Sequence, residues 1–376
     1  MNSPKYYKKI KIMHTVLSLE MGGLEKVVSD IVSGLDKDRY EVEVCCFDIL
    51  GHFASSLKVH GVRVNLLIRN QDRYDTLFPF RLKKLLHERK TDILHMHSGT
   101  FFLGTQAALL AGIPKMVYTD HGRHLVEPKI LLAMDRFCGF FVKKVIAVSH
   151  ELEKYLVDVV RLPAAKTSTI INGINTDLFR PGPKYPPLLD ELKIPPSHRV
   201  IGTVGRLAEV KDQVSMIKVF AKVLEQVPDV TLLLIGDGPL LPVLQQTAKD
   251  CNVAGNVVFA GKRTDTSKLL KLIDIFMLTS LSEGTSISLL EAMASGVTPV
   301  VTDVGGNPFI VQHEASGIVV SPGDITGMAD AVTYLLNHDE LRDKYSVNAM
   351  ESVRRDYSLE RMIDKYSALY DELYAC

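Results

Sequence analysis

The sequence predicts an α/β protein made of two doubly wound domains, each with a parallel β-sheet, which follow one another along the chain. The length of 376 residues exceeds what one hydrophobic core usually organises. Short β-branched, apolar runs alternate with helical patterns from end to end, and a proline-rich stretch interrupts this alternation once. Hydrophobic residues make up 46% of the chain and charged residues 23%, which is typical of a globular protein.

The first half of the chain contains seven runs that predict β-strands, most of them followed by a helical pattern. They lie at 9–17, 41–47, 62–67, 92–97, 115–120, 143–149 and 167–171. Near-continuous apolar strands separated by helices are typical of parallel sheets that helices cover on both faces. This half therefore predicts a first domain, which we place at 1–178.

The alternation breaks at 171–200, where six prolines lie between positions 181 and 196. Proline interrupts helices and sheets, so this stretch predicts a linker. Further strands are predicted after it at 200–205, 230–238, 256–261, 273–280, 297–303 and 317–321. They predict a second doubly wound domain at 179–355, and we expect the carboxyl ends of the strands of the two domains to face one another across a cleft.

The formal net charge is zero, but the two halves differ. Residues 1–180 contain 26 Lys and Arg against 19 Asp and Glu, so this half carries +7 and the rest −7. The basic excess predicts either a solvated surface or attraction to an anionic membrane surface or acceptor. We expect no nucleic-acid partner.

The cysteines and the first residues of the chain indicate the cellular compartment in which we expect the protein. The five cysteines have neither metal-binding nor redox spacing, which favours a reducing environment. The first residues predict a strand rather than a signal peptide, since their apolar run contains His14 and soon meets Glu20. No apolar stretch approaches the ~18 residues that span a bilayer. We therefore expect a cytoplasmic protein, and peripheral attachment to the cytoplasmic face of the membrane stays open.

A nicotinamide-dependent oxidoreductase is disfavoured. Such a protein would be expected to carry G-x-G-x-x-G just after a strand, where the following helix N-terminus takes the pyrophosphate. The glycine-containing turns of this chain read "EMGGLEKVV", "GTVGRLAEV" and "IGDGPLLP", and none of them has that spacing.

The stretch "SEGTSISLLEAMASG" at 282–296 follows a predicted strand and leads into a predicted helix. Glu283 lies in the loop and Glu291 about one turn into the helix, so the two carboxylates can flank an anion while accepting hydrogen bonds from a sugar on one side and a ribose on the other. The alternative is an ordinary loop acid and an ordinary helix acid. Free N–H groups at the start of the helix would seat a phosphate over Thr285, Ser286, Ile287 and Ser288.

The stretch "GTVGRLAEVKD" supplies two cations at the end of another predicted strand. Arg206 follows the strand directly, and Lys211 lies near the start of the next helix. Together they can neutralise a diphosphate, the arginine through its forked hydrogen bonds and the lysine as a point charge. The alternative is a solvated pair on the surface.

These stretches and further motifs resemble, in their order, the retaining glycosyltransferases of family 4. The motifs are "GDGPL" and "TDVGG" in the second half and "MGGLEKVV", "DILHMHS", "TDHG", "VIAVS" and "INGINTDLF" in the first, so the similarity covers nearly the whole chain. The resemblance implies the GT-B fold, in which two Rossmann-like domains face one another across a cleft. It also implies a transferase that moves a sugar from a nucleotide-sugar donor to an acceptor hydroxyl.

In the GT-B fold the last helix commonly crosses back to the first domain, and we expect this of residues 356–376. A helical pattern after Ser358 predicts one broad apolar face. It consists of Met362, Ile363, Tyr366, Leu369 and Tyr370.

The resemblance also implies roles for single residues in the second half. Arg206 and Lys211 would bind the donor diphosphate and stabilise it as it leaves. Glu291 would bind the ribose, and Glu283 the hydroxyls of the transferred sugar. Many members have Phe-Gly after the pair that corresponds to Glu283 and Gly284, whereas this chain has Thr285 and Ser286, whose hydroxyls either contact the donor or cap the helix.

In the first half, Gly22 and Gly23 would let backbone amides approach the diphosphate, because a Cβ would obstruct it. His121 would lie near the sugar and the reacting centre, with His97 as a competing candidate.

Three further residues of the second half could lie near the nucleotide base. They are Gly236, Gly238 and Arg263, and for the arginine an ordinary surface position is the alternative.

We expect no catalytic metal and no cofactor. The one Asp-x-Asp, Asp36 to Asp38, lies in a predicted connecting turn, and the two cations and the helix terminus already compensate a diphosphate. Mechanistically the family implies front-face attack, in which the leaving phosphate helps to deprotonate the acceptor. UDP is the expected nucleotide, with GDP left open. The acceptor is a sugar, a lipid-linked group or another hydroxyl compound, as in the assembly of cell-surface polysaccharide or glycolipid.

Two other functions stay open at this stage. A nucleotide-sugar epimerase on the same scaffold would release an altered sugar nucleotide without an acceptor, although the pair of Glu283 and Glu291 argues against it. A catalytically silent nucleotide-sugar-binding protein would show no turnover.

Overall fold

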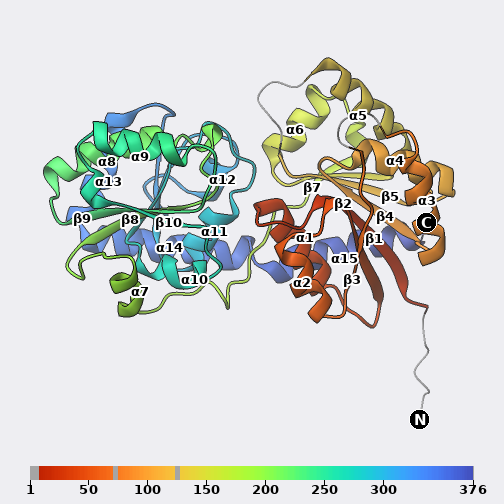
Figure 1. Cartoon of the computed structure of the whole chain (residues 1–376), viewed down its shortest axis with the longest axis horizontal. Coiled ribbons are helices and arrows are strands. Elements are labelled where there is room, and N and C mark those ends of the chain that lie inside the picture. Colours follow the sequence, from red (N-terminus) through yellow and green to blue (C-terminus); the bar gives the residue numbers. More distant parts are fainter. Residues whose placement is uncertain (1–7, 71–74, 123–127, 376) are drawn as a thin grey trace, which may run out of the picture. The chain divides into compact units, whose positions relative to one another are not determined.

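The computed structural model describes residues 8–70, 75–122 and 128–375, which belong to two compact units (Figure 1). Unit 1 comprises residues 1–172 and 360–376, and unit 2 comprises residues 173–359. The chain enters and leaves unit 2 side by side, since Ile174 donates to the carbonyl of Tyr357 and accepts from the N–H of Leu359, both at 2.9 Å. This pairing explains why the observed boundaries differ by several residues from those predicted at 178 and 355.

Unit 1 contains a seven-stranded sheet in the order β3-β2-β1-β4-β5-β6-β7, and every neighbouring pair is parallel. Its strands are β1 (Ile10–Ser18), β2 (Tyr40–Ile49), β3 (Arg63–Leu66), β4 (Ile93–His97), β5 (Met116–Asp120), β6 (Lys144–Ala147) and β7 (Thr167–Thr169). Its helices are α1 (Gly23–Gly34), α2 (His52–Val59), α3 (Phe78–Arg89), α4 (Phe101–Ala111), α5 (Lys129–Phe141), α6 (His150–Asp158), the 3-10 turn η1 (Ala164–Lys166) and α15 (Leu359–Ala375).

The two faces of this sheet have different coverings. Because side chains alternate along a strand, Met13, Leu94 and Met96 point into an apolar core closed by α3, α4, α5 and α6. On the other face, Val16 and Val44 pack against α1 and α2. The C-terminal helix α15 lies on that second face as well, so the sheet is doubly wound (Figure 1).

Unit 2 contains a six-stranded parallel sheet in the order β10-β9-β8-β11-β12-β13. Its strands are β8 (Arg199–Val204), β9 (Val230–Ile235), β10 (Val257–Gly261), β11 (Ile275–Leu278), β12 (Thr298–Thr302) and β13 (Ile318–Val320). Its helices are α7 (Pro186–Glu191), α8 (Gln213–Gln226), α9 (Leu241–Asp250), α10 (Thr266–Leu269), α11 (Ile287–Ala294), α12 (Asn307–Ile310), α13 (Ile325–Asn337) and α14 (Asp339–Asp356), with 3-10 turns η2 (Glu209–Lys211), η3 (Ala254–Asn256) and η4 (Leu270–Leu272).

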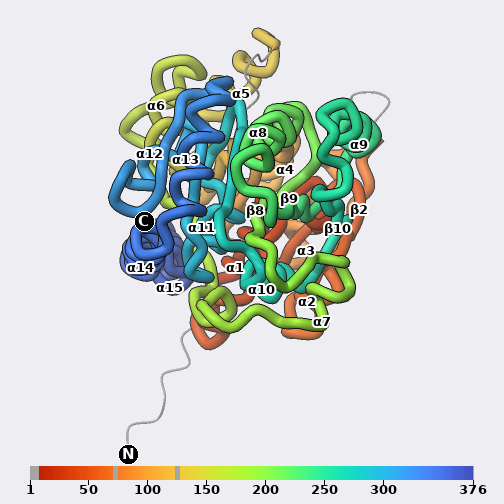
Figure 2. Tube along the Cα trace, turned by 90° about the vertical axis from the view of Figure 1, so that its left-hand side faces the viewer, coloured from red at the N-terminus to blue at the C-terminus, as the bar shows by residue number. Residues whose placement is uncertain are grey.

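Helices cover both faces of the second sheet as well. In Figures 1 and 2, α8, α9 and α13 lie on one side of it and α10, α11 and α14 on the other. The prediction of two doubly wound parallel-sheet domains is thus confirmed. The proline-rich stretch is more than a linker, because it forms α7 and buries Leu188, Leu189 and Ile194 within unit 2.

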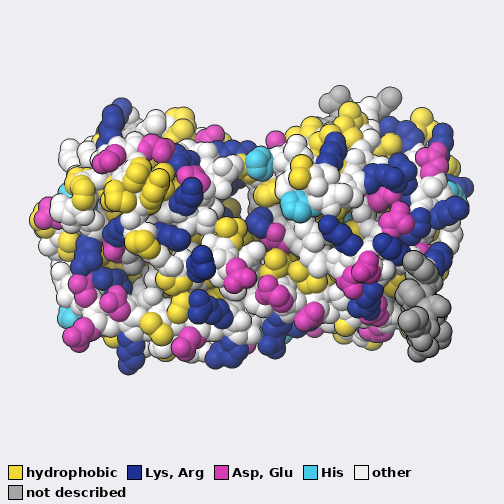
Figure 3. Space-filling view, turned by 90° about the horizontal axis from the view of Figure 1, so that it is seen from below, with side chains coloured by type: hydrophobic (Ala, Val, Ile, Leu, Met, Phe, Trp, Pro, Cys, Tyr) yellow, Lys and Arg dark blue, Asp and Glu magenta, His cyan; other side chains and the backbone are white. Residues whose placement is uncertain are grey.

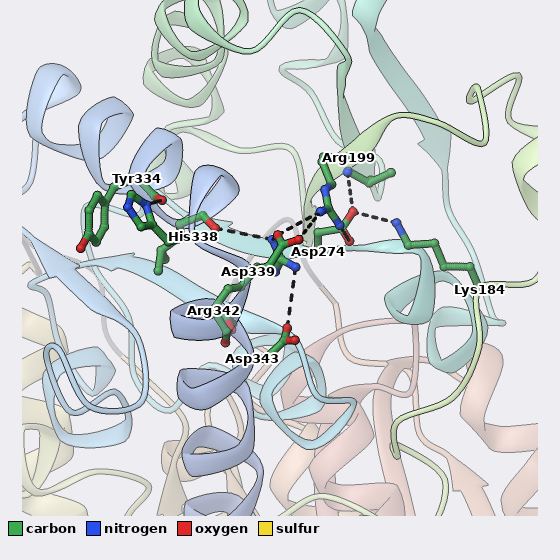
Figure 4. Close-up of polar contacts among 11 residues, drawn as sticks. Lys184, Arg199, Asp274, Tyr334, His338, Asp339, Arg342 and Asp343 are labelled. Carbon is green, nitrogen blue, oxygen red and sulfur yellow. Dashed lines mark hydrogen bonds and ion pairs between the residues drawn. The ribbon is translucent and has the colours of Figure 1, made fainter.

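An ion-pair network ties together the amino-terminal ends of β8 and β11 (Figure 4). Asp274, just before β11, accepts from Lys184 at 2.7 Å and from the backbone N–H of Val200 at 2.8 Å. Arg199 bonds both carboxylate oxygens of Asp339, at 2.9 and 2.8 Å. In parallel sheets ligands bind at the opposite, carboxyl ends of the strands. We therefore regard this network as structural.

The basic excess of the first half is not gathered on the face that Figure 3 shows, where Lys and Arg side chains of unit 1 alternate with Asp and Glu. Among the described residues, no helix combines the length and the apolar character that crossing a membrane requires.

Candidate functional site

The candidate site of unit 2 lies at the carboxyl ends of β8 and β11. The chain winds outward from β8 to β9 and β10 on one side and from β11 to β12 and β13 on the other. At such a reversal of strand order, the loops leave the two central strands in opposite directions and open a crevice for a ligand. The predicted stretch 202–212 includes the end of β8 and the loop after it, and the predicted stretch 282–296 follows β11.

The central contact of the site is between Lys211 and Glu283. The Nζ atom of Lys211 lies 2.6 Å from Oε1 of Glu283, and the hydroxyl of Ser280 donates to the same oxygen at 2.6 Å. The Glu283 side chain is only 7% exposed and that of Lys211 25%. Because both donors approach Oε1, the second oxygen of Glu283 accepts no hydrogen bond from the described residues, and it can accept one from a ligand.

Arg206 is exposed and lies just past the end of β8, on the loop that leads to Lys211. Its backbone carbonyl accepts a hydrogen bond from the buried Gln213 at 2.9 Å, which fixes the loop while leaving the guanidinium in solvent. An exposed guanidinium and a half-buried ammonium on one short loop can both serve an anion with several oxygens, such as a diphosphate.

The loop that carries Glu283 is held from β12. A Cβ on Gly305, whose φ is +55°, would overlap the carbonyl oxygen of Glu283, and the N–H of Gly306 donates to the carbonyl of Gly284 at 3.1 Å. The hydroxyl of Thr302 donates to the carbonyl of Ser280 at 2.7 Å. These contacts give the "TDVGG" motif a physical role, since only glycine lets the two loops approach so closely.

The residues after Glu283 form the start of α11. Thr285, Ser286 and Glu291 are buried, and Ile287 is the first residue of the helix. Ser286 occupies the N-cap position, but its hydroxyl makes no capping hydrogen bond and lies 3.4 Å from that of Ser288. Capping by Ser286, one of the two alternatives for these hydroxyls, is therefore not observed.

The glycines of "GDGPL" bring the end of β9 against the end of β8. A Cβ on Gly236, at φ +143°, would overlap the carbonyl oxygen of Gly205, and one on Gly238 would contact the carbonyl of Leu207. The two glycines thus contact the loop that carries Arg206, and their lack of a side chain allows this loop to pack closely against the end of β9.

The third predicted cation of unit 2, Arg263, is engaged elsewhere. Its guanidinium forks onto Asp265 at 2.8 and 2.7 Å and also pairs with Glu191. The hydrogen bond from Arg263 lowers the pKa of Asp265 below its usual value. Two carboxylates neutralise this arginine, and its place near a nucleotide base stays a prediction.

In unit 1, Gly22 and Gly23 lie where β1 leads into α1, Gly22 at the N-cap and Gly23 as the first helical residue. The carboxylate of Glu25 lies against Gly22, close enough that a Cβ there would overlap it. Burial raises the pKa of Glu25. A phosphate approaching this helix start would have to displace the side chain of Glu25 or meet it in its protonated form.

The predicted residue His121 and its competitor His97 lie together. Nδ1 of His97 is 2.9 Å from Nε2 of His121, directly after β5. The backbone N–H of His121 donates to the hydroxyl of Ser98 at 2.9 Å. The Nδ1 atom of His121 is buried and has no hydrogen-bond partner among the described residues. Burial lowers the pKa of His121 to about 3, so its ring is neutral.

Several residues around the two sites escaped the sequence analysis. Ser280 bonds Glu283, and Thr279 donates to the carbonyls of Lys211 and Asp212 at 3.1 and 2.9 Å. The available signal was their position directly after a predicted strand, where polar side chains reach the ligand-binding edge of the sheet. For His14, which bonds His97 at 3.0 Å, the sequence offered no signal beyond a polar residue inside an apolar strand.

Three histidines of unit 1 also form the one group in the described part of the chain whose geometry could hold a metal ion. The ligand atoms of His14, His95 and His97 lie within 4.8 Å of one another. The expectation of no catalytic metal considered Asp36 and Asp38 and the charge compensation by Arg206 and Lys211, and it stays a prediction. Asp36 accepts from the N–H of Asp38 at 2.8 Å within the turn between α1 and β2.

Two family models match the chain, one in each half. Residues 21–178 match the model described as glycosyltransferase family 4, and residues 187–352 match the one described as glycosyl transferases group 1.

Similar proteins include two curated bacterial enzymes and a solved structure. An Escherichia coli UDP-Gal:alpha-D-GlcNAc-diphosphoundecaprenol alpha-1,3-galactosyltransferase is 27% identical over 98% of both chains. A Mycobacterium tuberculosis GDP-mannose-dependent alpha-(1-6)-phosphatidylinositol monomannoside mannosyltransferase is 32% identical over 68% of this chain and 69% of its own. A crystal structure of an Anabaena protein in complex with UDP and glucose covers 96% of this chain and 100% of its own, with a TM-score of 0.87 and 23% identity.

Proposed function

The chain belongs to glycosyltransferase family 4, and from this premise we propose that it moves a sugar from a UDP-sugar to a hydroxyl of a lipid-linked or polysaccharide acceptor, with retention of the anomeric configuration. The proposed setting is the assembly of cell-surface polysaccharide or glycolipid. The observation that carries the proposal is the contact of Lys211 with Glu283 at 2.6 Å, on the loops that follow the two central strands β8 and β11.

The nucleotide and the stereochemistry are argued from the relatives. The E. coli relative, which aligns over nearly the full length, is named for UDP-Gal, and the Anabaena structure holds UDP. The mycobacterial relative is named for GDP-mannose, so GDP-sugars are the competing donors. Both curated names specify an alpha linkage in the product. For a donor that is itself α-linked, an α product means retention.

The proposed chemistry follows from the charges at the ends of β8 and β11. As the bond between the anomeric carbon and the donor phosphate breaks, its electron pair stays on the diphosphate, where Arg206 and Lys211 stabilise the added negative charge. The acceptor oxygen attacks the same carbon, and its proton passes to the departing phosphate oxygen. Glu283 holds the hydroxyls of the sugar through its unoccupied oxygen, so the reacting carbon stays in position.

We also propose that the enzyme works at a membrane surface, which α5 contacts. The exposed side of this helix is apolar, with Phe140 73% and Ile130 66% exposed and Phe137 beside them on the same face. The exposed Lys129 and Lys143 lie just inside and just past the ends of the helix. Exposed aromatic side chains with cations at their rim suit the interface of an anionic bilayer, where a lipid-linked acceptor would reside.

A thermal-shift screen with UDP-, GDP- and ADP-sugars tests the donor. A UDP-sugar at 100 times its dissociation constant should stabilise the protein by roughly 2.7 kcal/mol. Lys211→Ala should abolish that shift. The matched control is Lys222→Ala, which removes an exposed lysine of the same unit and should keep it.

A second measurement separates transfer from the alternatives. Release of free UDP that requires a hydroxyl acceptor supports a transferase, because an epimerase would need no acceptor and a binding protein would not turn over. Stabilisation by GDP-sugars alone would refute the proposed donor.

A further inference from the structure

Four histidines of unit 1 and a tyrosine of α15 form a continuous hydrogen-bonded array that ends at His121. Nε2 of His121 lies 2.9 Å from Nδ1 of His97, and Nε2 of His97 lies 3.0 Å from Nδ1 of His14. Nε2 of His14 lies 3.4 Å from the hydroxyl of Tyr370, and that hydroxyl lies 2.6 Å from Nδ1 of His95. Every ring in the array thus contacts the next through a nitrogen or hydroxyl.

Strand register brings these side chains to one face of the sheet. His14 on β1 is paired with His95 on β4, and His97 is paired with Thr119 on β5. Residues paired in parallel strands point to the same side, and His95 and His97 do so because they are two positions apart. Helix α15 covers this face with the fully buried Tyr370. The array is therefore enclosed by the sheet and the C-terminal helix.

The array is neutral, and a neutral array has only two proton orders. Burial lowers the pKa of His14 to about 3 and those of His95 and His97 well below the usual value. A neutral imidazole has one N–H and one lone pair, so once one link has its proton, every following link is determined. In the first order each ring donates away from His121, whose Nδ1 then carries a lone pair. In the second order the donors are reversed, and that Nδ1 carries a hydrogen.

Two observations favour the first order. The 2.6 Å between the Tyr370 hydroxyl and His95 is typical of a donating O–H rather than a donating N–H, so the single proton of Tyr370 goes to His95. His14 must then donate to Tyr370, which sets the direction for His97 and His121. Secondly, Nδ1 of His121 is buried without a partner among the described residues, and a buried N–H without an acceptor is rarer in proteins than an unused acceptor.

We propose that Tyr370, His14 and His97 are positioning residues that hold His121 in one tautomer, with a lone pair on Nδ1, so that His121 accepts a hydrogen bond from a sugar hydroxyl. The C-terminal helix thereby takes part in ligand recognition although it does not touch the ligand. The tautomer follows from the contacts within unit 1 alone. Only its use toward a sugar rests on the proposed transferase function.

Nitrogen NMR of the full-length protein, labelled with ¹⁵N-histidine and recorded without donor, tests the tautomer directly. His121→Gln identifies the His121 signals by their loss. We expect Nε2 of His121 to show a bonded proton and Nδ1 the shift of an unprotonated nitrogen, unchanged between pH 6 and 8. A proton on Nδ1 would overturn the proposal whatever the enzyme transfers.

Two tyrosine variants test the role of the helix. Tyr370→Phe removes the hydroxyl that selects the proton order, so His121 should show a mixture of both tautomers, and kcat should fall about tenfold. Tyr366→Phe is the matched control, since Tyr366 lies one turn earlier and is equally buried. Among the described residues its hydroxyl bonds Thr119, at 3.4 Å, which lies beyond the far nitrogen of His95 and so leaves the proton of Tyr370 in place. It should keep the tautomer and lower kcat less than twofold. If kcat fell equally in the two variants, Tyr370 would contribute packing alone, and the proposed positioning role would be wrong.

The same nitrogens also lie close enough to bind a metal ion, which gives a second decisive measurement. A metal bound to all three rings would take nitrogens from the hydrogen bonds that they make, such as the one between His14 and His97. We expect elemental analysis of the purified protein to find substoichiometric zinc. One zinc per chain, together with metal-shifted nitrogen signals, would overturn the array.

Discussion

At the scale of single residues, the contacts of Glu283 explain how one carboxylate can bond Lys211 and Ser280 and still accept a hydrogen bond from a ligand. Ser280 and Lys211 both donate to its Oε1, which fixes the side chain and leaves Oε2 for a ligand. Glu291, by contrast, lies buried within α11. The two acids therefore have different surroundings, and their removal should have different effects.

We expect Glu283→Gln to leave the affinity for free UDP nearly unchanged but to lower the turnover of the UDP-sugar strongly, since it acts on the sugar as charge develops. Glu291→Gln should weaken both UDP and the UDP-sugar, by about 1–3 kcal/mol, because the ribose is common to both. Calorimetric titration of each variant with the two ligands measures this. If Glu283→Gln loses UDP affinity as severely as Glu291→Gln, the assignment of the sugar to Glu283 and of the ribose to Glu291 is wrong.

Charge compensation by Arg206 and Lys211 leads to a prediction about metal ions. Because these two cations would compensate the charge of the proposed diphosphate, we expect transfer to continue in excess EDTA. The assay is UDP release with and without the chelator. A loss of activity that Mg²⁺ or Mn²⁺ restores would show that these cations are insufficient.

At the scale of elements, the loops after β11 and β12 support one another through Gly305. Gly305→Ala should lower the free energy of unfolding by more than the roughly 1–2 kcal/mol of a left-handed alanine, because its Cβ also overlaps the carbonyl of Glu283. Gly323→Ala is the matched control, with φ +77° and open space around its Cβ. Urea unfolding gives both values, and equal losses would mean that the loop contact has no energetic weight.

The apolar face of α5 gives a second prediction at this scale. The wild-type protein should bind anionic liposomes more tightly than neutral ones, and less tightly as salt is raised, since surface attraction is screened over about 10 Å at 0.1 M. Phe140→Ser should reduce this binding. Phe309→Ser, which removes a phenylalanine that is 63% exposed in unit 2, is the control and should not. Sedimentation with liposomes measures the binding of the wild-type protein and of both variants. Equal binding to anionic and neutral liposomes would contradict the proposed membrane-binding surface.

At the scale of the whole molecule, the buried histidines link stability to pH. The pKa of His14 is lowered to about 3 by burial, whereas in an unfolded chain it is about 6.5. Between these values the unfolded chain binds more protons, so the free energy of unfolding falls as the pH drops below about 6.5, by up to about 1.4 kcal/mol per pH unit for each such histidine. The lowered pKa values of His95 and His97 act in the same direction.

We therefore expect the urea midpoint to be clearly lower at pH 5.0 than at pH 7.5. His87→Gln, which removes an exposed histidine on α3, should leave this difference unchanged. Equal midpoints at the two pH values would contradict the prediction.

The sequence by itself determined the strands, their doubly wound order and the motifs at their ends. The predicted strands agree with the observed ones to within three residues, because apolar runs and turn residues are local signals. The sequence also placed Arg206, Lys211 and Glu283 after strands whose carboxyl ends lie at one edge of a sheet.

Only the tertiary structure decided which of these side chains meet. Lys211 and Glu283 are 72 positions apart, and His95 and Tyr370 are 275 apart. The pairing of Arg263 with Glu191 was equally invisible in the sequence. Such contacts depend on the register between strands that are not consecutive and on where α15 packs, and both are set by the burial of side chains across the whole unit rather than by local residue patterns.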